Sequence, residues 1–363
     1  MTCDTPRVFN MTHSTFLNSC SRLCLPGLLL VSLVLRLYRI GEESLWLDEI
    51  ETVRLVQLPF GEMMNYIVHA DSHPPLYSLL LHLWVRIAGT SETAVRFWSA
   101  IFGCLSVWAT YLTGTVIFNR RTGLIAGLLL AIAPFHVYYS QEARMYALLG
   151  LFAAGMMLAL WQVTFDQRSR WRYLLVVTSV GALFTQNIAL FLIVLQNLWY
   201  LLTRHCHHMR PRQWLYLQIT IVSLAFFWLP GLYLQLHATR NIGFLSWIQS
   251  PTLAHVADVL FEFCGAFPIH SESEPSIPYL GAAGILSLGF LVAFLVPFIT
   301  QIRHSLNSGS STTSDPDFSA TVFDNGTSVM SVPVATRLRC HQILYLGLWF
   351  VIPIVSPLLL SYV

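Results

Sequence analysis

Charged residues are scarce along this chain of 363 amino acids. Asp, Glu, Lys and Arg together make up 10% of the sequence, whereas hydrophobic residues make up 55%. A soluble globular domain usually carries about 25% charged residues, so this composition excludes an ordinary soluble protein. Long apolar runs and a mean hydropathy of +0.61 instead predict an all-α, polytopic membrane protein.

Other absences narrow the range of functions. The net charge is only +2, which gives no reason to expect a nucleic-acid partner. The seven cysteines form no CxxC pair, and the closest two are Cys20 and Cys24. We interpret them as small core residues or free thiols. A polar stretch precedes the first apolar run, and no small-residue cleavage pattern follows that run, so we expect no cleavable signal peptide.

Clusters of arginine set the expected orientation in the membrane. The first span is expected from Leu25 to Tyr38, with the polar tail 1–24 on the inner side. Whether the short apolar segment Pro75–Ala88 crosses the membrane decides on which side the three later arginine clusters lie. The clusters fall outside if the segment crosses and inside if it does not. The positive-inside rule favours the second choice, and about 14 residues suit an interfacial or re-entrant helix better than a span. The clusters are Arg120 and Arg121; Arg168, Arg170 and Arg172; and Arg204, Arg210 and Arg212.

This orientation divides the chain into four parts, of which the inner tail is the first. Residues 25–302 form a membrane-embedded module. Its outer loops are 41–75, 138–146 and 237–276. A stretch rich in Ser, Thr, Asp and Asn at 303–339 is expected to be a flexible inner linker, and residues 340–363 a final span. The alternation predicts about nine spans. Because the final span reaches the last residue, we expect the chain to be a truncated piece of a longer protein.

The first outer loop, GEESLWLDEIETVRLVQLPFGEMMNYIVHADSHPP, is unusually long. It has roughly 30 residues, and loops of that length are usually functional or disordered. Its many apolar residues argue against disorder. Asp48 and Glu49 stand directly after an apolar LWL triplet, which draws them toward the interface, where desolvation strengthens a carboxylate as a base. We therefore expect an outer-face catalytic loop that carries juxtamembrane helices.

A second outer loop, YYSQEARMY at 138–146, adds Glu142 and Arg144 to the same face. Charges at membrane depth cost about 2.5–3.5 kcal/mol, so they need partners or a function. Any one of these residues, taken alone, is more often an ordinary solvated loop charge. The convergence of acidic residues from two loops on one face nevertheless favours an active site.

Several patterns resemble metal sites but are interpreted otherwise. His69, Asp71 and His73 do not match a recognised ligand spacing, and Pro74 restricts His73, so a structural or substrate-contact role is favoured over metal binding. We expect no cofactor and no metal ligands, with a divalent metal at the outer site as the alternative. Some patterns on the inner side are expected to have no role: Asp315-Pro316-Asp317, the His205, His207 and His208 cluster, and glycosylation sequons at Asn10 and Asn325.

Four motifs in order resemble a known family. They are LWLDE at 45–49, HPPLY at 73–77, SETAVRFWSA at 91–100 and YYSQEARMYAL at 138–148. The same order occurs in bacterial family-39-like glycosyltransferases, membrane-embedded enzymes with the GT-C fold, whose relatives include the protein O-mannosyltransferases and the lipid A aminoarabinose transferase. The resemblance covers Leu25 to about Val163, and beyond that only the pattern of spans is similar. LWLDE, HPP and SQEARMY in this order are a fairly specific signal, whereas a lone Asp-Glu pair would not be.

The resemblance implies a sugar donor carried on a polyprenyl phosphate, and inverting transfer to a lipid, glycan or protein acceptor. The reaction would take place at the outer face of the bacterial plasma membrane, among membrane lipids. Asp48 matches the aspartate that activates the acceptor hydroxyl, and Glu49 matches its acidic neighbour. The residues assigned to donor or substrate binding are Arg54, His73, Arg96, Glu142 and Arg144.

The chemistry of these residue types agrees with that reaction. A polyprenyl phosphate is a good leaving group whose growing charge suits a fixed arginine fork. The acceptor proton suits a partly desolvated aspartate, and no covalent nucleophile is needed. A transporter or flippase of lipid-linked sugars is the competing interpretation. It should show midplane charges and repeated halves, neither of which the sequence has. An inactive, truncated relative is a third possibility.

Overall fold

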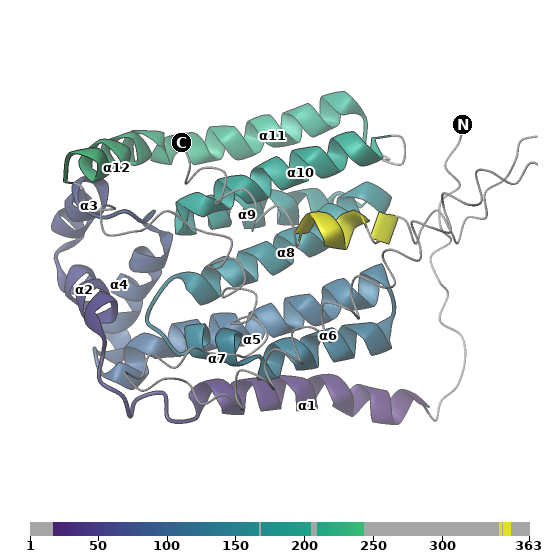
Figure 1. Cartoon of the computed structure of the whole chain (residues 1–363), viewed down its shortest axis with the longest axis horizontal. Coiled ribbons are helices and arrows are strands. Elements are labelled where there is room, and N and C mark those ends of the chain that lie inside the picture. Colours follow the sequence, from purple (N-terminus) through teal and green to yellow (C-terminus); the bar gives the residue numbers. More distant parts are fainter. Residues whose placement is uncertain (1–16, 167, 205–208, 243–340, 343, 350–363) are drawn as a thin grey trace, which may run out of the picture. The chain divides into compact units, whose positions relative to one another are not determined.

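The computed structural model describes residues 17–166, 168–204, 209–242, 341–342 and 344–349. All regular elements in this part are helices, so the predicted all-helical class is confirmed (Figure 1). The chain divides into two units, residues 1–252 with 352–363 and residues 253–351, and the helices below belong to the first. Several sequence-based predictions lie outside the described residues. They concern residues 1–16, most of the third outer loop, the span 277–302, the linker 303–339, most of the last span, the histidines 205, 207 and 208, the DxD motif and both sequons.

The first unit contains a bundle of helices that run side by side (Figure 1). They are α1 (Leu17–Leu37), α5 (Glu92–Ile117), α6 (Arg120–Ile132), α8 (Tyr146–Phe165), α9 (Arg170–Thr185), α10 (Leu190–Thr203, entered through the 3₁₀ turn η1, Asn187–Ala189) and α11 (Pro211–Ala225). The helix α5 packs against α1, α6 and α8. In the described part, three helical stretches are long and apolar enough to cross a membrane: Glu92–Ile117, Tyr146–Phe165 and Pro211–Gln235. The chain is therefore a multi-pass membrane protein.

Two glycines bring α5 and α6 into backbone contact. A Cβ atom added to Gly114 of α5 would lie 2.8 Å from the Cα atom of Gly123 in α6. No larger side chain fits there unless the helices move apart. Small residues at helix contacts are the usual means of close packing in membranes, where lipid removes the hydrophobic force between helices. This contact fixes α6 against the central helix.

The first outer loop and the short apolar segment after it fold into a cap of three helices at one end of the bundle (left in Figure 1). They are α2 (Leu47–Gln57), α3 (Phe60–His69) and α4 (Leu76–Ala88). Val56, Met63, Ile67 and Leu81 of the cap belong to an apolar core that continues into α5 and α8. The helix α4 has 13 residues, or about 20 Å at 1.5 Å per residue, which is short of the roughly 30 Å hydrocarbon core. The expected juxtamembrane helices are therefore present, while the expectation that Pro75–Ala88 does not cross stays a prediction.

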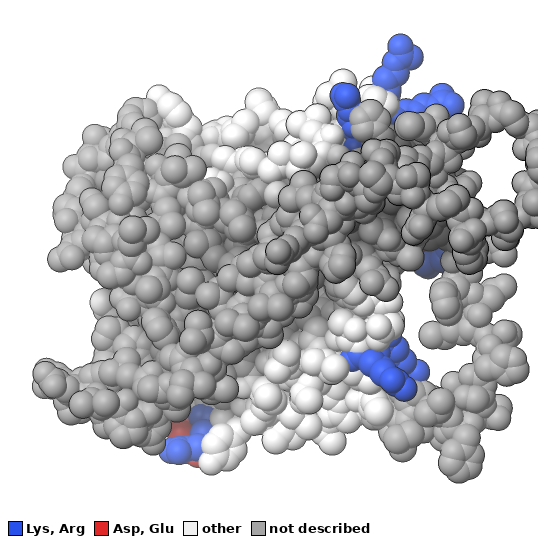
Figure 2. Space-filling model, turned by 45° about the vertical axis from the view of Figure 1, so that its right-hand side comes forward, with Lys and Arg blue, Asp and Glu red and all other residues white. Residues whose placement is uncertain are grey.

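The arginine clusters share the opposite end of the bundle. The turns α5–α6, α8–α9 and α10–α11 all lie at the end away from α2, α3 and α4 (Figure 1). Figure 2 shows Arg side chains gathered mainly toward this end, beside helix surfaces that carry no charged side chains. The basic ends and the cap thus lie at opposite ends of the bundle. That the basic end faces inward and the capped end outward stays a prediction from the positive-inside rule.

A break between α6 and α7 (Pro134–Ser140) bends this pair of helices by 63°. Pro134 has no N–H, so the carbonyl of Leu130 loses the donor that a continuous helix would supply. The buried Arg36 of α1 replaces it. Its Nη2 atom donates to the Leu130 carbonyl over 3.4 Å, and its Nη1 atom donates to the Ala131 carbonyl over 3.1 Å. The arginine thus caps the interrupted helix.

The far end of α7 is fastened to α1 as well. The Gln141 side chain donates to the carbonyls of Arg36 over 3.2 Å and of Tyr38 over 2.8 Å. These carbonyls lie at and just past the C-terminal end of α1, where a helix leaves its C=O groups without partners. The contacts at both ends of α7 determine where the second outer loop begins. Residues 138–146 therefore start from a fixed position at the capped end.

Candidate active site

Asp48 and Glu49 occupy the first turn of α2. The helix begins at Leu47, with Trp46 in extended conformation as the preceding cap residue. The free N–H groups and the dipole at a helix N-terminus favour negative charge, so both acids suit this position. The Glu49 carboxylate also accepts from the backbone N–H of Trp46 over 3.3 Å, which is the half of a capping box that a glutamate at this position supplies. The sequence therefore starts the helix where it places the acids.

Glu49 forms a buried two-armed ion pair with Arg96 of α5. Nε of Arg96 lies 2.9 Å from Oε1 and Nη2 lies 2.6 Å from Oε2, and the glutamate side chain is 0% exposed. The backbone N–H of Ala143, in the second loop, donates to the same Oε1 over 2.7 Å. Arg96 donates in addition to the carbonyls of residues 40, 43 and 44.

This pair connects three segments: the start of α2, the start of α5 and the second loop. Because every partner position of Glu49 and Arg96 is occupied by protein, the geometry gives both residues a positioning role. Sequence reasoning had placed Glu49 with the catalytic groups and Arg96 with the donor-binding groups. The structure brings both to the site but leaves no arm of either charge free for a ligand.

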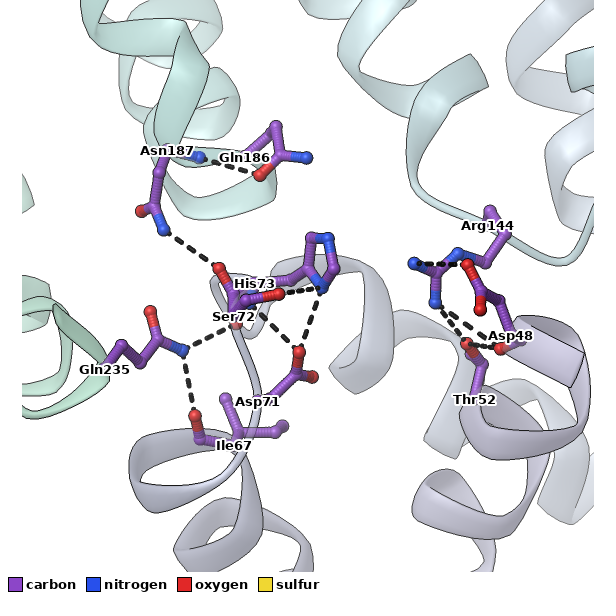
Figure 3. Close-up of polar contacts among 10 residues, drawn as sticks. All are labelled: Asp48, Thr52, Ile67, Asp71, Ser72, His73, Arg144, Gln186, Asn187 and Gln235. Atoms are coloured by element: carbon purple, nitrogen blue, oxygen red, sulfur yellow. Dashed lines mark hydrogen bonds and ion pairs between the residues drawn. The ribbon is translucent and has the colours of Figure 1, made fainter. Parts of the chain in front are cut away.

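Asp48 is in a more open position. Its Oδ2 atom lies 3.6 Å from Nη2 of Arg144, and its side chain is 38% exposed (Figure 3). That distance is too long for a hydrogen bond, so the ion pair is loose. Arg144 is held instead by the Thr52 hydroxyl, which accepts from Nη1 over 3.0 Å and itself donates to the Asp48 carbonyl over 2.7 Å. Asp48 therefore lies beside a fixed cation while its carboxylate stays accessible.

Glu142 lies near these charges and is 5% exposed. Its Oε2 atom is buried without a hydrogen-bond partner among the described residues. Burial raises the pKa of Glu142 to about 7. The negative charges of Glu49 and Asp48 add to this rise, whereas a hydrogen bond with Tyr138 and the charge of Arg144 oppose it. A carboxyl group with such a pKa can exchange a proton near neutral pH.

His73 belongs to a second polar network, at the turn before α4 (Figure 3). Asp71 accepts from the backbone N–H of His73 over 3.0 Å, and its Oδ1 atom lies 2.9 Å from Nδ1 of the ring. Asn187 donates to the Ser72 carbonyl over 3.0 Å, and Gln235 donates to the His73 carbonyl over 2.9 Å. With Nδ1 facing Asp71, Nε2 is the nitrogen available to a ligand.

Tyr77 connects the HPPLY motif to the second loop. Its hydroxyl lies 3.0 Å from Oγ of Ser99 in α5, and Ser99 donates to the carbonyl of Arg144 over 3.3 Å. Both hydroxyls are buried, so the chain of contacts is shielded from solvent. The three motifs that follow LWLDE thus meet through two hydrogen bonds.

The structure does not bring every predicted residue to the site. Asp48, Glu49, Arg96, Glu142 and Arg144 come together, and His73 lies in the neighbouring network. Arg54 is exposed on α2 and forms no ion pair with any described residue. Sequence reasoning missed five polar residues whose hydrogen bonds hold the helices and loops around the site in place, which we call the frame residues. Their only sign in the sequence was a polar residue at the end of an apolar run. They are Arg36, Thr52, Gln141, Asn187 and Gln235.

No group of three metal-binding side chains close enough to hold an ion occurs in the described residues. The ring of His69 contacts the carbonyl of Asn65 in its own helix, whereas His73 contacts Asp71. The two histidines therefore have separate partners. That the outer site needs no metal stays a prediction.

Comparison with known proteins supports the motif resemblance. Residues 72–232 match the family model of dolichyl-phosphate-mannose-protein mannosyltransferases, and this confirms the resemblance for that part of the chain. The match includes His73, Arg96, Glu142 and Arg144 but begins after Asp48 and Glu49.

Among solved structures, a similar one is the Saccharomyces cerevisiae protein O-mannosyltransferase Pmt1–Pmt2 complex bound to the sugar donor. It is 16% identical with a TM-score of 0.48, over 65% of this chain and 35% of that one. This chain therefore matches about a third of the length of that relative. No curated protein matches the chain.

Proposed function

We propose that this chain is a membrane glycosyltransferase that takes a sugar from a polyprenyl-phosphate donor and transfers it, with inversion, to an acceptor hydroxyl at the outer face. The observation that carries the proposal is the loose pair of Asp48 and Arg144. It places an accessible carboxylate beside a fixed arginine, and each comes from a different loop. The family match over residues 72–232 supports the same reaction class.

In this proposal Asp48 acts as the general base. The acceptor oxygen attacks the anomeric carbon while its proton passes to the Asp48 carboxylate. The bond between the anomeric carbon and the phosphate oxygen breaks, and its electron pair stays on the phosphate. Direct displacement from the face opposite the leaving group gives inversion, and it needs no covalent enzyme intermediate.

Arg144 stabilises the charge that grows on the leaving phosphate. Its guanidinium is mostly buried and is fixed by Thr52, and its Nε atom has no hydrogen-bond partner among the described residues. A preorganised arginine fork in a poorly solvated site is well suited to a phosphate group. His73 would add a ring nitrogen on the other side of the donor head group.

The donor and acceptor are proposed from the family description. Dolichyl-phosphate mannose is named there as the sugar source and a protein as the acceptor, so these are the first substrates to test. Lipid and glycan acceptors, and undecaprenyl-phosphate sugars as donors, form the second set. The proposed location is a bacterial plasma membrane with the cap on the outer side.

The full chain in lipid nanodiscs provides the assay. Each labelled donor is incubated with peptide, lipid and glycan acceptors, and the transferred label is counted. Transfer that depends on Asp48 supports the proposal. Movement of the labelled lipid across vesicle membranes without any transfer would contradict it and would favour a flippase.

Single cysteines at position 119 or 169, in a background without other cysteines, test the orientation. A membrane-impermeant maleimide should label neither position from the outside of intact cells, because both turns lie at the basic end. Labelling of both would contradict the proposed outer face.

A further inference from the structure

The site contains more acidic residues than arginines. Glu49 is neutralised by Arg96 at 2.6 Å, and Asp48 faces Arg144 at 3.6 Å. Each arginine thus serves one acid. Glu142 is the fifth charged group, and no salt bridge to a described cation exists for it. An unpaired carboxylate in a poorly solvated position is costly, and such groups usually take up a proton instead.

The surroundings of Glu142 favour its neutral form. Asp48 and Glu49 approach it from α2, Tyr138 from α7 and Arg144 from its own loop. Two of these four groups are acids, one is a phenol, and the only cation already faces Asp48. Arg96 of α5 is fully engaged by Glu49 and by backbone carbonyls. Among the described residues, the Oε2 atom has no hydrogen-bond partner, although the residue is only 5% exposed.

We propose that Glu142 carries a proton in the resting site and uses it to bind the phosphate of the sugar donor. This inference rests on the proposed function. A polyprenyl phosphate that bears a sugar is a phosphodiester with one permanent negative charge. An ionised Glu142 would repel that charge, whereas a protonated carboxyl donates a hydrogen bond to it through the oxygen that now has no partner.

The same proton can follow the reaction. When the sugar leaves, the phosphodiester becomes a monoester, whose second pKa is about 6. The proton of Glu142 can then pass to a phosphate oxygen, while the acceptor proton passes to Asp48. One proton is given and one is taken, so the step needs no other reactant. The reset requires only that a proton return from Asp48 or from solvent to Glu142.

The pKa of Glu142, raised by burial to about 7, suits this exchange. Affinity for the donor should depend on the fraction of protein with Glu142 protonated. It should therefore be greatest below about pH 7 and fall by about tenfold for each pH unit above that value, since one proton is linked to binding. The donor diester itself does not titrate in this range.

The first test needs no donor. Infrared difference spectra of the full chain in nanodiscs are recorded across pH for the wild type and for Glu142→Gln. A protonated-carboxyl band that disappears as pH rises through about 7, and that Glu142→Gln lacks, supports the proposal. Glu51→Gln, at an exposed acid of α2, is the matched control and should leave the band unchanged. Absence of any band that depends on Glu142 would overturn the inference.

The second test measures the affinity for dolichyl-phosphate mannose and for undecaprenyl-phosphate mannose against pH. Glu142→Gln is permanently neutral and can still donate, so its affinity should stay high and lose the pH dependence. Equal, pH-dependent affinity in the wild type and in Glu142→Gln would overturn the role of Glu142 while leaving the transferase proposal intact. No binding of either donor by the wild type at any pH would overturn the proposed function, and the phosphate contact with it.

Discussion

Asp48 and Glu49 are neighbours in the sequence, yet they have opposite surroundings. Glu49 is fully buried, forms two short contacts with Arg96 and accepts a backbone N–H from the second loop. Asp48 is 38% exposed and has one loose cation at 3.6 Å. Consecutive residues of a helix point about 100° apart, so one acid faces the bundle while the next faces the open side.

The difference shows how a pair of like acids can divide two tasks. A carboxylate whose partners are all supplied by protein fixes geometry, and it cannot take a proton without losing those partners. A carboxylate with spare acceptor positions can bind a hydroxyl and accept its proton. The buried pair thus provides the frame in which the open pair can react.

The largest expected effect comes from breaking the buried pair. Glu49→Ala leaves the Arg96 guanidinium buried without its counter-charge, which typically costs about 3–5 kcal/mol of stability. We expect a large loss of folded protein, measured by thermal unfolding in detergent with tryptophan fluorescence. Glu51→Ala, at an exposed acid one position past Ile50, should change stability little. Similar melting temperatures for the two variants would contradict the role given to Glu49.

The next effect separates chemistry from structure. Asp48→Asn preserves shape and hydrogen bonding but cannot take a proton at neutral pH, so turnover should fall by about 10²–10⁴-fold. Donor affinity and melting temperature should stay close to those of the wild type, unlike in Glu49→Ala. Near-normal turnover would show that Asp48 is not the base and would move attention to Glu142 or to a metal-bound water.

A smaller effect is expected at the cation of the open pair. Arg144→Ala removes a charge-assisted contact to phosphate worth about 1.5–3 kcal/mol, so donor affinity should weaken by about 10–100-fold along with turnover. Arg144→Lys keeps the charge but loses the fork, and it should recover part of the affinity. An unchanged dissociation constant for the donor in Arg144→Ala would refute the phosphate contact.

The smallest effect concerns the frame around His73. Asn187→Ala removes one hydrogen bond to the Ser72 carbonyl, which should cost about 1 kcal/mol of stability. The Michaelis constant for the donor should rise modestly because the turn that carries His73 becomes less fixed. Asn65→Ala on α3, where the side chain is exposed, is the control. Equal effects of the two substitutions would mean that Asn187 does not hold the turn.

The meeting of the two outer loops could be predicted from sequence. The arginine clusters assign both loops to the same side of the membrane, and the ordered motifs indicate which residues of each loop matter. The different roles of Asp48 and Glu49 could not be predicted. The two residues share their chemistry and their flanks, and only the position of Arg96, 47 residues later, distinguishes them. Arg54, by contrast, is exposed on α2 and forms no ion pair with a described residue, so its assignment to donor binding stays a prediction.

The frame residues were hidden for a related reason. Arg36 and Gln235 lie in apolar runs, and both donate to backbone carbonyls of helices that are distant in the sequence. The sequence does not reveal which backbone carbonyl lacks a hydrogen-bond donor, except where a proline removes the N–H that would normally donate to it. Pro134 was such a mark, but its partner lies about 100 positions away, as the contact between Arg36 and His136 illustrates.

The arginine that caps the break before α7 makes the residues at positions 36 and 134 depend on each other. Arg36 and Pro134 are matched, because the proline creates an acceptor without a donor and the arginine answers it. Changing either residue alone leaves a polar group in the bundle without its hydrogen-bond partner. Replacing both, with Ala at 134 to restore an N–H and an apolar residue at 36, would return a backbone donor to the Leu130 carbonyl. We expect the segment to straighten in such a chain and the second loop to lose its position beside Asp48.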